Sequence, residues 1–391
     1  MCESNLNLFN LIIIASVFIG TTFGMLLIFT KRINRKANIL LGLVTFIIVL
    51  WNIWVLSLDF QITNYFPLFY IIPLNFSLAL GPLLYLYVKR ITNFNHLLSK
   101  KSFLHFLPLL LELVVHLIIS YDAFSNNIIG IETNTYLKLM PILQLFAIIS
   151  IVTYSFFALK SIKKYHSWLH KNYSNNDAYK LKWLYRLIII FALLWFLWVP
   201  YTIIDYVVFN FQLGINDYYP MYVLLSVITI WISVEAFLRP EIILLEAKKE
   251  KNDSEENSTI KEKTSEEIMK KASWLKEQML INLFYLNSEL TLKSLAESLN
   301  MHPNILSKVI NEGLGKNFSD FVNEYRVNAI IEKMQNKRYD HITLLGLSFE
   351  CGFNSKTTFN RVFKNIKGIT PLQYKKSLKN TPEAQKMSTI L

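Results

Sequence analysis

Hydrogen-bond donors recur at helical spacing in the stretch GFNSKTTFNRVFKNIKGITP, residues 352–371. At about 100° per residue, the apolar residues share one arc of about 100°: Phe359, Val362, Phe363 and Ile366. The opposite arc, about 140° wide, carries donors suited to base edges and phosphates: Lys356, Thr357, Asn360, Arg361 and Lys364. We expect the polar arc to be exposed and to contact nucleic acid, while the apolar arc packs on a core.

A second stretch, residues 291–311, has the same organisation. Thr291 is a favourable cap for the helix LKSLAESL. Asn300 tolerates a left-handed conformation in the turn that follows, and Pro303 fits the first turn of the next helix. In that helix Ile305, Leu306, Val309 and Ile310 point inward, and the outward residues are Asn304, Ser307, Lys308 and Asn311. Two short helices joined by a tight turn constitute a helix-turn-helix unit.

The neighbouring segments predict a second such unit. A long helix, KNFSDFVNEYRVNAIIEKMQ, begins after the cap Asn317 and would link the two units. Thr343 then caps LLGLSFE, the residues CGF make the turn, and Gly368 ends the second helix. Residues 354–379 hold seven Lys or Arg and no Asp or Glu, and the chain has a formal net charge of +12. Because a solvated surface normally mixes signs, this run favours contact with phosphates.

Another set of ionisable residues lies inside long apolar stretches. His105, Glu112 and His116 recur at i, i+7 and i+11, which predicts that they share one helix face. Glu112 and His116, four residues apart, are placed to hydrogen-bond within one turn. Asp205 is a further candidate in a later stretch. Ionisable groups at such positions indicate a polar ligand pocket or a proton-sensitive pair. The structural alternative, a cross-helix hydrogen bond, is left open by the sequence.

The apolar stretches predict membrane spans. Hydrophobic residues make up 53% of the chain and the mean hydropathy is +0.33, while charged residues crowd the C-terminal part. About 20 apolar residues in a helix cross a bilayer. Seven stretches meet this length, at about 8–30, 37–58, 66–88, 103–121, 138–160, 185–209 and 219–238. A buried helix of a soluble protein could imitate one such stretch, but not seven in series.

The loops between these spans predict an orientation. The loops after spans one, three and five are basic: KRINRK, KRITNFNHLLSKK and KSIKKYHSWLHKNYSNNDAYKLK. The alternate loops contain neither Lys nor Arg: DFQITNYF, YDAFSNNIIGIETNTY and NFQLGINDYY. Lys and Arg mark the cytoplasmic side. We therefore expect the N-terminus outside and the C-terminal part in the cytoplasm.

The resulting organisation is an all-α protein with two functional parts. Residues 1–240 would form a seven-span transmembrane sensor, and residues 268–391 a soluble double helix-turn-helix domain opened by the helix SWLKEQMLINLFYL. Between them, residues 241–267 contain NDSEENST, which is too polar and too poor in aromatic residues to fold alone. We interpret this segment as a linker.

The segment from about 270 to 379 resembles the DNA-binding domain of the AraC/XylS family of bacterial transcription regulators. LTLKSLAESLNMHPNILSKVINEGLGKNFSDFVNEYR resembles the first helix-turn-helix and linking helix of that family. CGFNSKTTFNRVFKNIKGITPLQYKK resembles its second half, with GF at the turn, F-x-R-x-F-K, and a closing G-x-(S/T)-P. The resemblance covers under a third of the chain. The seven-span part resembles a membrane region that precedes such domains in some bacterial regulators, and it implies no ligand.

The resemblance implies two helix-turn-helix units that enter neighbouring major-groove segments. By position, it implies base contacts from Asn304, Ser307, Lys308, Lys356, Thr357, Asn360 and Arg361, and we add Lys364 from the same polar arc. Gly346 and Ser348 stand where the family usually has small helix-forming residues. Gly346 should cost about 1 kcal/mol in helix propensity, which would make its helix less stable.

These features imply a one-component transcription regulator in the bacterial inner membrane. Its expected partners are promoter DNA, the lipid bilayer, a second copy, RNA polymerase and an unidentified ligand or membrane signal. The alternative is a transporter or channel whose tail reports transport. It predicts polar groups on several helices along one path, whereas the ionisable residues concentrate on span four.

No sequence motif indicates an enzyme. The chain has no P-loop, no H-E-x-x-H and no G-x-S-x-G, so we expect neither catalytic residues nor a cofactor. Its two cysteines, Cys2 and Cys351, lie at opposite ends. They can form neither a disulfide framework nor a zinc site, and we expect no metal.

Overall fold

The computed structural model describes residues 6–30, 34–66, 73–93, 100–125, 134–209, 213–238 and 265–379. The chain divides into two compact units. The apolar unit contains Met1–Lys163 and Leu181–Asp253, and the C-terminal unit contains Lys164–Lys180 and Ser254–Leu391. The described residues form helices and no strand, so the predicted all-α class is confirmed for them.

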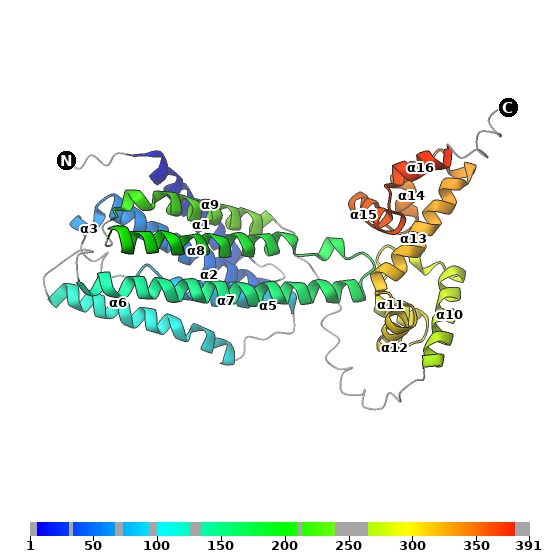
Figure 1. Ribbon diagram of the computed structural model, residues 1–391, viewed down its shortest axis with the longest axis horizontal. Coiled ribbons are helices and arrows are strands. Elements are labelled where there is room, and N and C mark those ends of the chain that lie inside the picture. Colours follow the sequence, from blue (N-terminus) through cyan, green and yellow to red (C-terminus); the bar gives the residue numbers. More distant parts are fainter. Residues whose placement is uncertain are drawn as a thin grey trace. The chain divides into compact units, whose positions relative to one another are not determined.

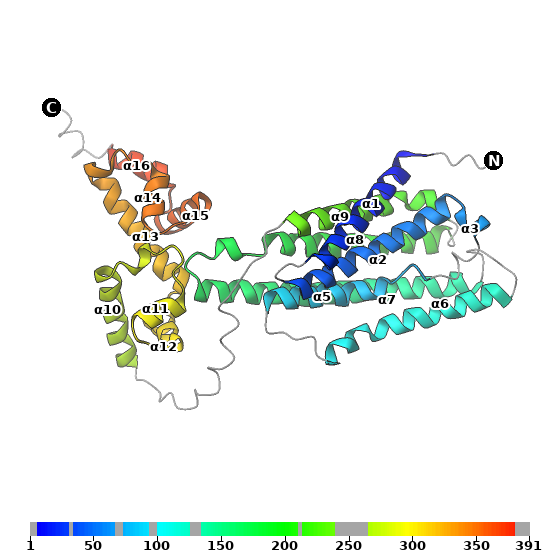
Figure 2. The ribbon, with the colours of Figure 1, turned by 180° about the vertical axis from the view of Figure 1, so that it is seen from behind.

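The apolar unit is a set of long helices lying side by side, as views from opposite sides show (Figures 1 and 2). Its elements are α1 (Leu8–Phe29), α2 (Arg35–Asp59), α3 (Ile62–Tyr65), α5 (Ser77–Thr92), η1 (Lys100–Phe106), α6 (Leu107–Ser125), α7 (Asn134–Asn172), α8 (Lys182–Phe209), η3 (Ile215–Tyr218) and α9 (Tyr219–Leu238). Helix α1 packs against α2 and α9, and α2 also packs against α5.

Six segments in the described part of the chain are long and apolar enough to cross a membrane. They are Leu8–Phe29, Arg35–Asp59, Ser102–Asp122, Pro141–Asn172, Lys182–Phe209 and Ile215–Leu238. The predicted third span, 66–88, contains residues 67–72, which lie outside the described residues, and α5 itself has 16 residues. The count of seven spans therefore stays a prediction.

Small residues bring α1 and α2 together. A Cβ on Gly20 would lie 2.5 Å from Cγ2 of Val49, and one on Gly42 would lie 2.7 Å from Cγ1 of Ile28. Gly20 and Gly24 are four residues apart on α1. This small-xxx-small spacing lets two helix backbones approach closely, and it is common between helices in lipid.

Helix α7 is longer than the sequence predicts. The predicted span five ends near residue 160, yet α7 continues to Asn172 through residues assigned to a basic loop. The reason is an apolar stripe among the basic residues: Ile162, Tyr165 and Leu169 are all buried. Their spacing of three and four residues is that of one helix face. The last turns of α7, from Lys164, belong to the C-terminal unit.

The C-terminal unit consists of short helices around one longer helix. Its elements are η2 (Asp177–Tyr179), α10 (Ser265–Ile281), η5 (Phe284–Leu286), α11 (Leu292–Ser298), α12 (Pro303–Lys308), η6 (Val309–Gly313), α13 (Phe318–Gln335), η7 (Lys337–Tyr339), α14 (Leu344–Glu350), α15 (Lys356–Lys367) and α16 (Pro371–Lys379). The predicted linker lies outside the described residues up to residue 264. The predicted opening helix ends early because Leu283 takes a left-handed conformation with φ 51°.

The predicted cap residues of the C-terminal unit are confirmed, whereas two helix boundaries differ: α12 ends at Lys308 and is continued by η6, and α15 begins at Lys356. Three capping side chains accept a backbone N–H as expected: Thr291, Asn317 and Thr343. Asn300 has φ 50° in the first turn, and Gly368 has φ 79° at the end of α15. A left-handed residue at these points stops a helix, because its backbone cannot continue the right-handed ladder.

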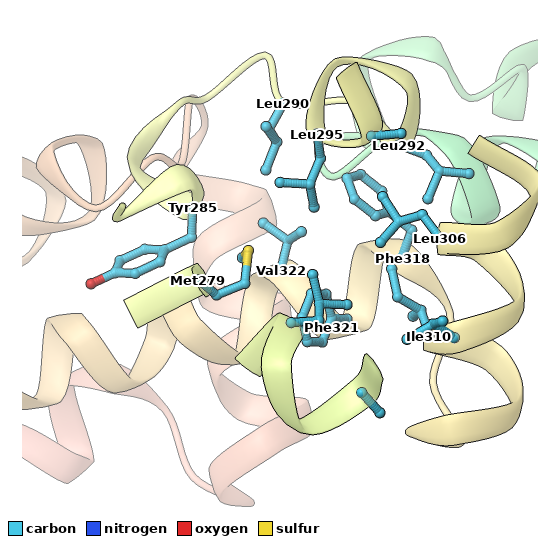
Figure 3. Close-up of a cluster of buried hydrophobic side chains, with 14 residues drawn as sticks. Met279, Tyr285, Leu290, Leu292, Leu295, Leu306, Ile310, Phe318, Phe321 and Val322 are labelled. Carbon is cyan, nitrogen blue, oxygen red and sulfur yellow. The ribbon is translucent and has the colours of Figure 1, made fainter. Parts of the chain in front are cut away.

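Two hydrophobic clusters share α13 as a common wall. Phe318, Phe321 and Val322 of α13 pack with α10, α11 and α12, as Figure 3 shows for the first cluster. Val327 and Ile330, further along the same helix, pack with α14 and α15 in the second cluster. Figure 2 shows α13 running from one group of short helices to the other. The linking helix therefore fixes the two short-helix pairs relative to each other.

Candidate nucleic-acid interface and buried polar sites

Helix α15 presents a polar face and buries the opposite one. Ser355 caps it by accepting the N–H of Thr358 at 3.1 Å. The residues that face the second cluster are buried: Thr358, Phe359, Val362 and Phe363. The exposed residues include Lys356, Thr357, Asn360 and Lys364. The predicted division of faces holds except at Ile366, which is 38% exposed because it lies in the last turn, outside the second cluster.

Helix α12 repeats this arrangement at the first unit. Leu306, Val309 and Ile310 are buried in the first cluster, with Ile305 packed at its edge. Asn304, Lys308 and Asn311 are exposed, while Ser307 is half-buried. The Nδ2 of Asn311 donates to Oγ of Ser307 at 3.1 Å.

The sequence predicts an exposed Arg361 on the polar face, but the structure pairs its side chain with Asp177. Its Nη2 donates to Oδ2 of Asp177 at 2.6 Å, and its side chain is 39% exposed. The Nζ of Lys180 donates to the other carboxylate oxygen of Asp177 at 2.7 Å. Burial raises the pKa of Asp177, but the hydrogen bonds and charges of Lys180 and Arg361 outweigh it and hold that pKa well below its ordinary value. A base contact by Arg361 therefore has to use its other N–H donors or displace Asp177.

The segment that supplies Asp177 is docked on the C-terminal unit. Tyr173, Ser174, Asn175 and Asn176 are all buried. The N–H and the hydroxyl of Ser174 both donate to the carbonyl of Leu290, at 3.2 and 2.7 Å. We call residues 173–180 the docked segment. Its signal in the sequence is Asp177 itself, the one acid in an otherwise basic loop.

Arg326 of α13 binds the docked segment through a hydrogen bond to Ser174. It is 1% exposed, and its Nη2 donates to Oγ of Ser174 at 3.1 Å and to the carbonyl of Asn287 at 2.7 Å. Its Nε donates to the carbonyl of Tyr285 at 2.8 Å. Burial lowers the pKa of Arg326 to about 10, against the opposing charge of Glu289, so the guanidinium stays protonated near neutral pH. Sequence reasoning missed this residue because its partners lie far away along the chain.

Comparison with known protein families identifies the C-terminal helices. A family model described as a helix-turn-helix domain matches residues 295–377. These residues form a helix-turn-helix domain of the AraC type. The match contains α12, α13, α14 and α15, and so both polar faces.

A curated relative matches part of the chain. It is described as an uncharacterized HTH-type transcriptional regulator, YtdP, of Bacillus subtilis (strain 168), and it is 30% identical over 88 residues. The aligned part is 22% of this chain and 11% of the relative, so the chain spans about a tenth of the relative's length. No solved structure matches the chain.

In the apolar unit, Glu112 and Asp205 line one cavity of about 220 Å³. Glu112 accepts hydrogen bonds from N–H groups of Ser77 and Leu78, at 3.0 and 3.1 Å, and from the Ser77 hydroxyl at 2.7 Å. These donors form the N-terminus of α5, where a carboxylate is favourable. Asp205 accepts from the N–H of Leu213 at 3.3 Å and from the hydroxyl of Tyr218.

The other two candidates lie elsewhere. His105 is in η1 rather than on the helix of Glu112, and its Nδ1 lies 2.9 Å from the hydroxyl of Tyr154. It lines a separate cavity of about 780 Å³. His116 lines neither cavity, and its Nε2 has no hydrogen-bond partner among the described residues. The predicted bond between Glu112 and His116 is replaced by the bonds to α5, because the start of α5 offers three convergent donors.

Proposed function

We propose that this protein is a membrane-bound, one-component transcription regulator. The apolar unit lies in the bilayer and senses a signal, and the C-terminal unit binds promoter DNA through two helix-turn-helix units. The observation that carries this proposal is that one chain combines a helix-turn-helix domain with apolar helices of membrane length, six of them in the described part of the chain.

The surface of the apolar unit supports the placement in a bilayer. Phe18, Leu117 and Phe156 are 74%, 69% and 64% exposed on three different helices. Contiguous exposed apolar surface is unfavourable in water but suits lipid tails. The alternation of basic loops with loops that lack Lys and Arg supports an outside N-terminus and a cytoplasmic C-terminal unit.

The two polar faces support direct reading of DNA. The side chains proposed to contact it are Asn304, Ser307, Lys308, Lys356, Thr357, Asn360, Arg361 and Lys364. Amides and cations of this kind bond base edges in the major groove and phosphates beside it. Because α13 joins both clusters, the two faces move as one body and can read neighbouring segments. A second copy on a paired site and RNA polymerase complete the proposed assembly.

One observation favours a second candidate, a transporter with a reporting tail. Gln144 of α7 and Asp205 of α8 line the same cavity as Glu112, so polar groups from several helices surround one space. A transporter needs such a space to open to both sides in turn. Uptake of a labelled ligand into sealed vesicles would be expected from the transporter and not from the receptor.

The main test is a genome-wide map of DNA bound by the full-length protein. We expect enrichment at discrete promoter sites. The matched control is a full-length variant with Lys356, Thr357 and Asn360 replaced by Ala, because these exposed residues support no core. Equal maps for the two full-length proteins, or no discrete sites, would contradict the proposal.

A further inference from the structure

The ionisable carboxylic side chains that line the cavity, Glu112 and Asp205, face no basic side chain in its lining. This lining contains no Lys, Arg or His among the described residues. Both are almost fully buried, Glu112 at 1% and Asp205 at 4% exposed. A buried acid without a counter-charge favours a ligand that brings a positive charge of its own.

Aromatic rings form a large part of the remaining wall. Trp51, Trp195 and Trp198 pack together, with ring centroids 5.4 to 5.9 Å apart. Tyr218 and Tyr222 continue this wall on the side of Asp205. Faces of Trp and Tyr rings attract cations through their quadrupole, and several rings around one space are a recognised way to hold an ammonium group.

Polar atoms of the same wall lack partners. The Nε1 atoms of Trp51, Trp195 and Trp198 are buried without a hydrogen-bond acceptor among the described residues. These three side chains are at most 6% exposed, and all of them line the cavity. Buried indole N–H groups usually find an acceptor. A ring that turned its N–H toward the cavity would find this acceptor in a ligand that carries an oxygen atom.

We propose that this cavity binds a small organic ammonium ion that also carries a hydroxyl or carbonyl oxygen. This inference rests on the proposed sensing function and names the ligand class. The ammonium group lies against Asp205 and the ring faces, and the oxygen accepts from the indole N–H groups. The volume of about 220 Å³ restricts the ligand to a molecule smaller than those that ordinary ligand pockets hold.

The same chemistry has two sources, a free amine and the headgroup of an amine-containing lipid. Both would be recognised by the same carboxylate and rings. They differ in supply, because a free amine arrives from water and a headgroup arrives from the bilayer. The experiment therefore needs bilayers with and without such lipids.

The test is calorimetric titration of the full-length protein in lipid nanodiscs of pure phosphatidylglycerol. The probe is choline, and its control is 3,3-dimethylbutan-1-ol, which has the same shape and hydroxyl but a neutral carbon in place of nitrogen. We expect saturable choline binding at one site, and binding of the neutral analogue at least about tenfold weaker. Repeating the titration in phosphatidylethanolamine nanodiscs identifies the source, since a headgroup ligand would compete with choline there.

Two variants locate the site. Asp205→Asn keeps the shape of the side chain and should weaken choline binding about tenfold. Asp59→Asn is the matched control, because Asp59 also accepts from a tyrosine hydroxyl, that of Tyr219, but does not line the cavity. Trp198→Phe keeps a ring and removes one N–H donor, so it should weaken choline less than Asp205→Asn does.

Equal binding of choline and its neutral analogue would overturn the inference, as would equal loss in both Asp variants or the absence of choline binding in the phosphatidylglycerol nanodiscs. Binding of specific DNA by the same preparation separates this failure from that of the proposed function. Retained DNA binding with no ammonium binding would contradict only the proposed ligand class. Ammonium binding without DNA binding would contradict the proposed regulator function but not the proposed ligand of the cavity.

Discussion

At the scale of single residues, the pair of Asp177 and Arg361 decides how the polar face of α15 is presented. The two residues are 184 positions apart, and their side chains meet at 2.6 Å. Arg361 gives one of its five N–H donors to Asp177, and the carboxylate offsets the positive charge that would otherwise attract a phosphate or a guanine edge. The docked segment therefore competes with DNA for this residue.

The first prediction is that Asp177→Asn increases the affinity of the full-length protein for its promoter DNA. Removing the charge weakens the internal partner of Arg361, and we expect a gain of about threefold to tenfold. Equilibrium binding at fixed salt measures it. Glu324→Gln is the control, because it removes one charge from the same unit but pairs with Lys316. A loss of affinity in Asp177→Asn would show instead that Asp177 orients Arg361 toward DNA.

The pKa of Asp177 sets the pH behaviour of this contact. Its docked pKa is lowered from an ordinary value of 3.8. The contact therefore contributes its full stability above that ordinary value and loses it only as the pH falls through the lowered pKa. Between about pH 5 and 8 we expect the affinity gain of Asp177→Asn to be constant. A gain that disappears within this range would exclude Asp177 as the charge that matters.

The second prediction concerns Arg326, which is buried with three backbone or hydroxyl acceptors around it. Arg326→Lys keeps the charge but cannot reach all of these acceptors. We expect the free energy of unfolding of the C-terminal unit to fall by roughly 3 kcal/mol. Chemical unfolding followed by tyrosine and tryptophan fluorescence measures it. Lys316→Met is the control, since its exposed ion pair should contribute less than about 1 kcal/mol. Similar losses in both variants would argue against a special role for Arg326.

At the scale of elements, the turn between α14 and α15 leaves no room for a side chain at Gly352. Gly352 has φ 88°, and a Cβ there would lie 2.3 Å from the carbonyl oxygen of Tyr285 and 2.9 Å from Nε of Arg326. The turn before α15 therefore lies against Arg326, which also binds Ser174 of the docked segment. Only a residue without a side chain fits both the backbone angle and the space.

The third prediction is that Gly352→Ala destabilises the C-terminal unit far more than Gly368→Ala. Both positions are left-handed, but a Cβ at Gly368 meets nothing within 4 Å. Gly368→Ala should therefore cost only the conformational strain of about 1 kcal/mol. Gly352→Ala adds a steric clash with backbone, which should displace the turn and reduce DNA binding. Thermal unfolding of the two variants compares them, and equal losses would mean that the turn relaxes freely.

At the scale of the whole molecule, orientation in the membrane is open to a direct test. A reporter fused after Leu238 should be cytoplasmic, and one inserted near Asn126 should lie outside. The physical reason is the absence of Lys and Arg from the alternate loops. Finding both reporters on the same side would mean that the number of spans between them differs from the prediction.

The fifth prediction is that the protein acts on paired sites. A single C-terminal unit presents two reading helices and should bind weakly. Tethering two copies in one bilayer raises the effective concentration of the second, which increases affinity without a new contact. Footprints should therefore contain two half-sites, and shifting one by half a helical turn should reduce binding. Unchanged protection after that shift would favour a single copy.

Much of the C-terminal unit could be predicted from the sequence because its signals are local. Thr291, Asn300, Asn317, Thr343 and Gly368 mark helix ends through bonds and angles within a few residues. The alternation of polar and apolar residues likewise assigned the faces of α12 and α15. The long apolar stretches predicted helices of membrane length for the same reason, because length and composition need no knowledge of partners.

Contacts between distant segments were decided only by the tertiary structure. Asp177 pairs with Arg361, Ser174 binds Arg326, and Glu112 caps α5 instead of bonding His116. In each case the sequence determined which groups could bond, but many partners were chemically equivalent. Packing selects among them, because a buried polar group takes the partner that the surrounding helices hold within bonding distance. The sequence by itself thus determined helices, caps and exposed faces, and the fold determined which of those faces are free.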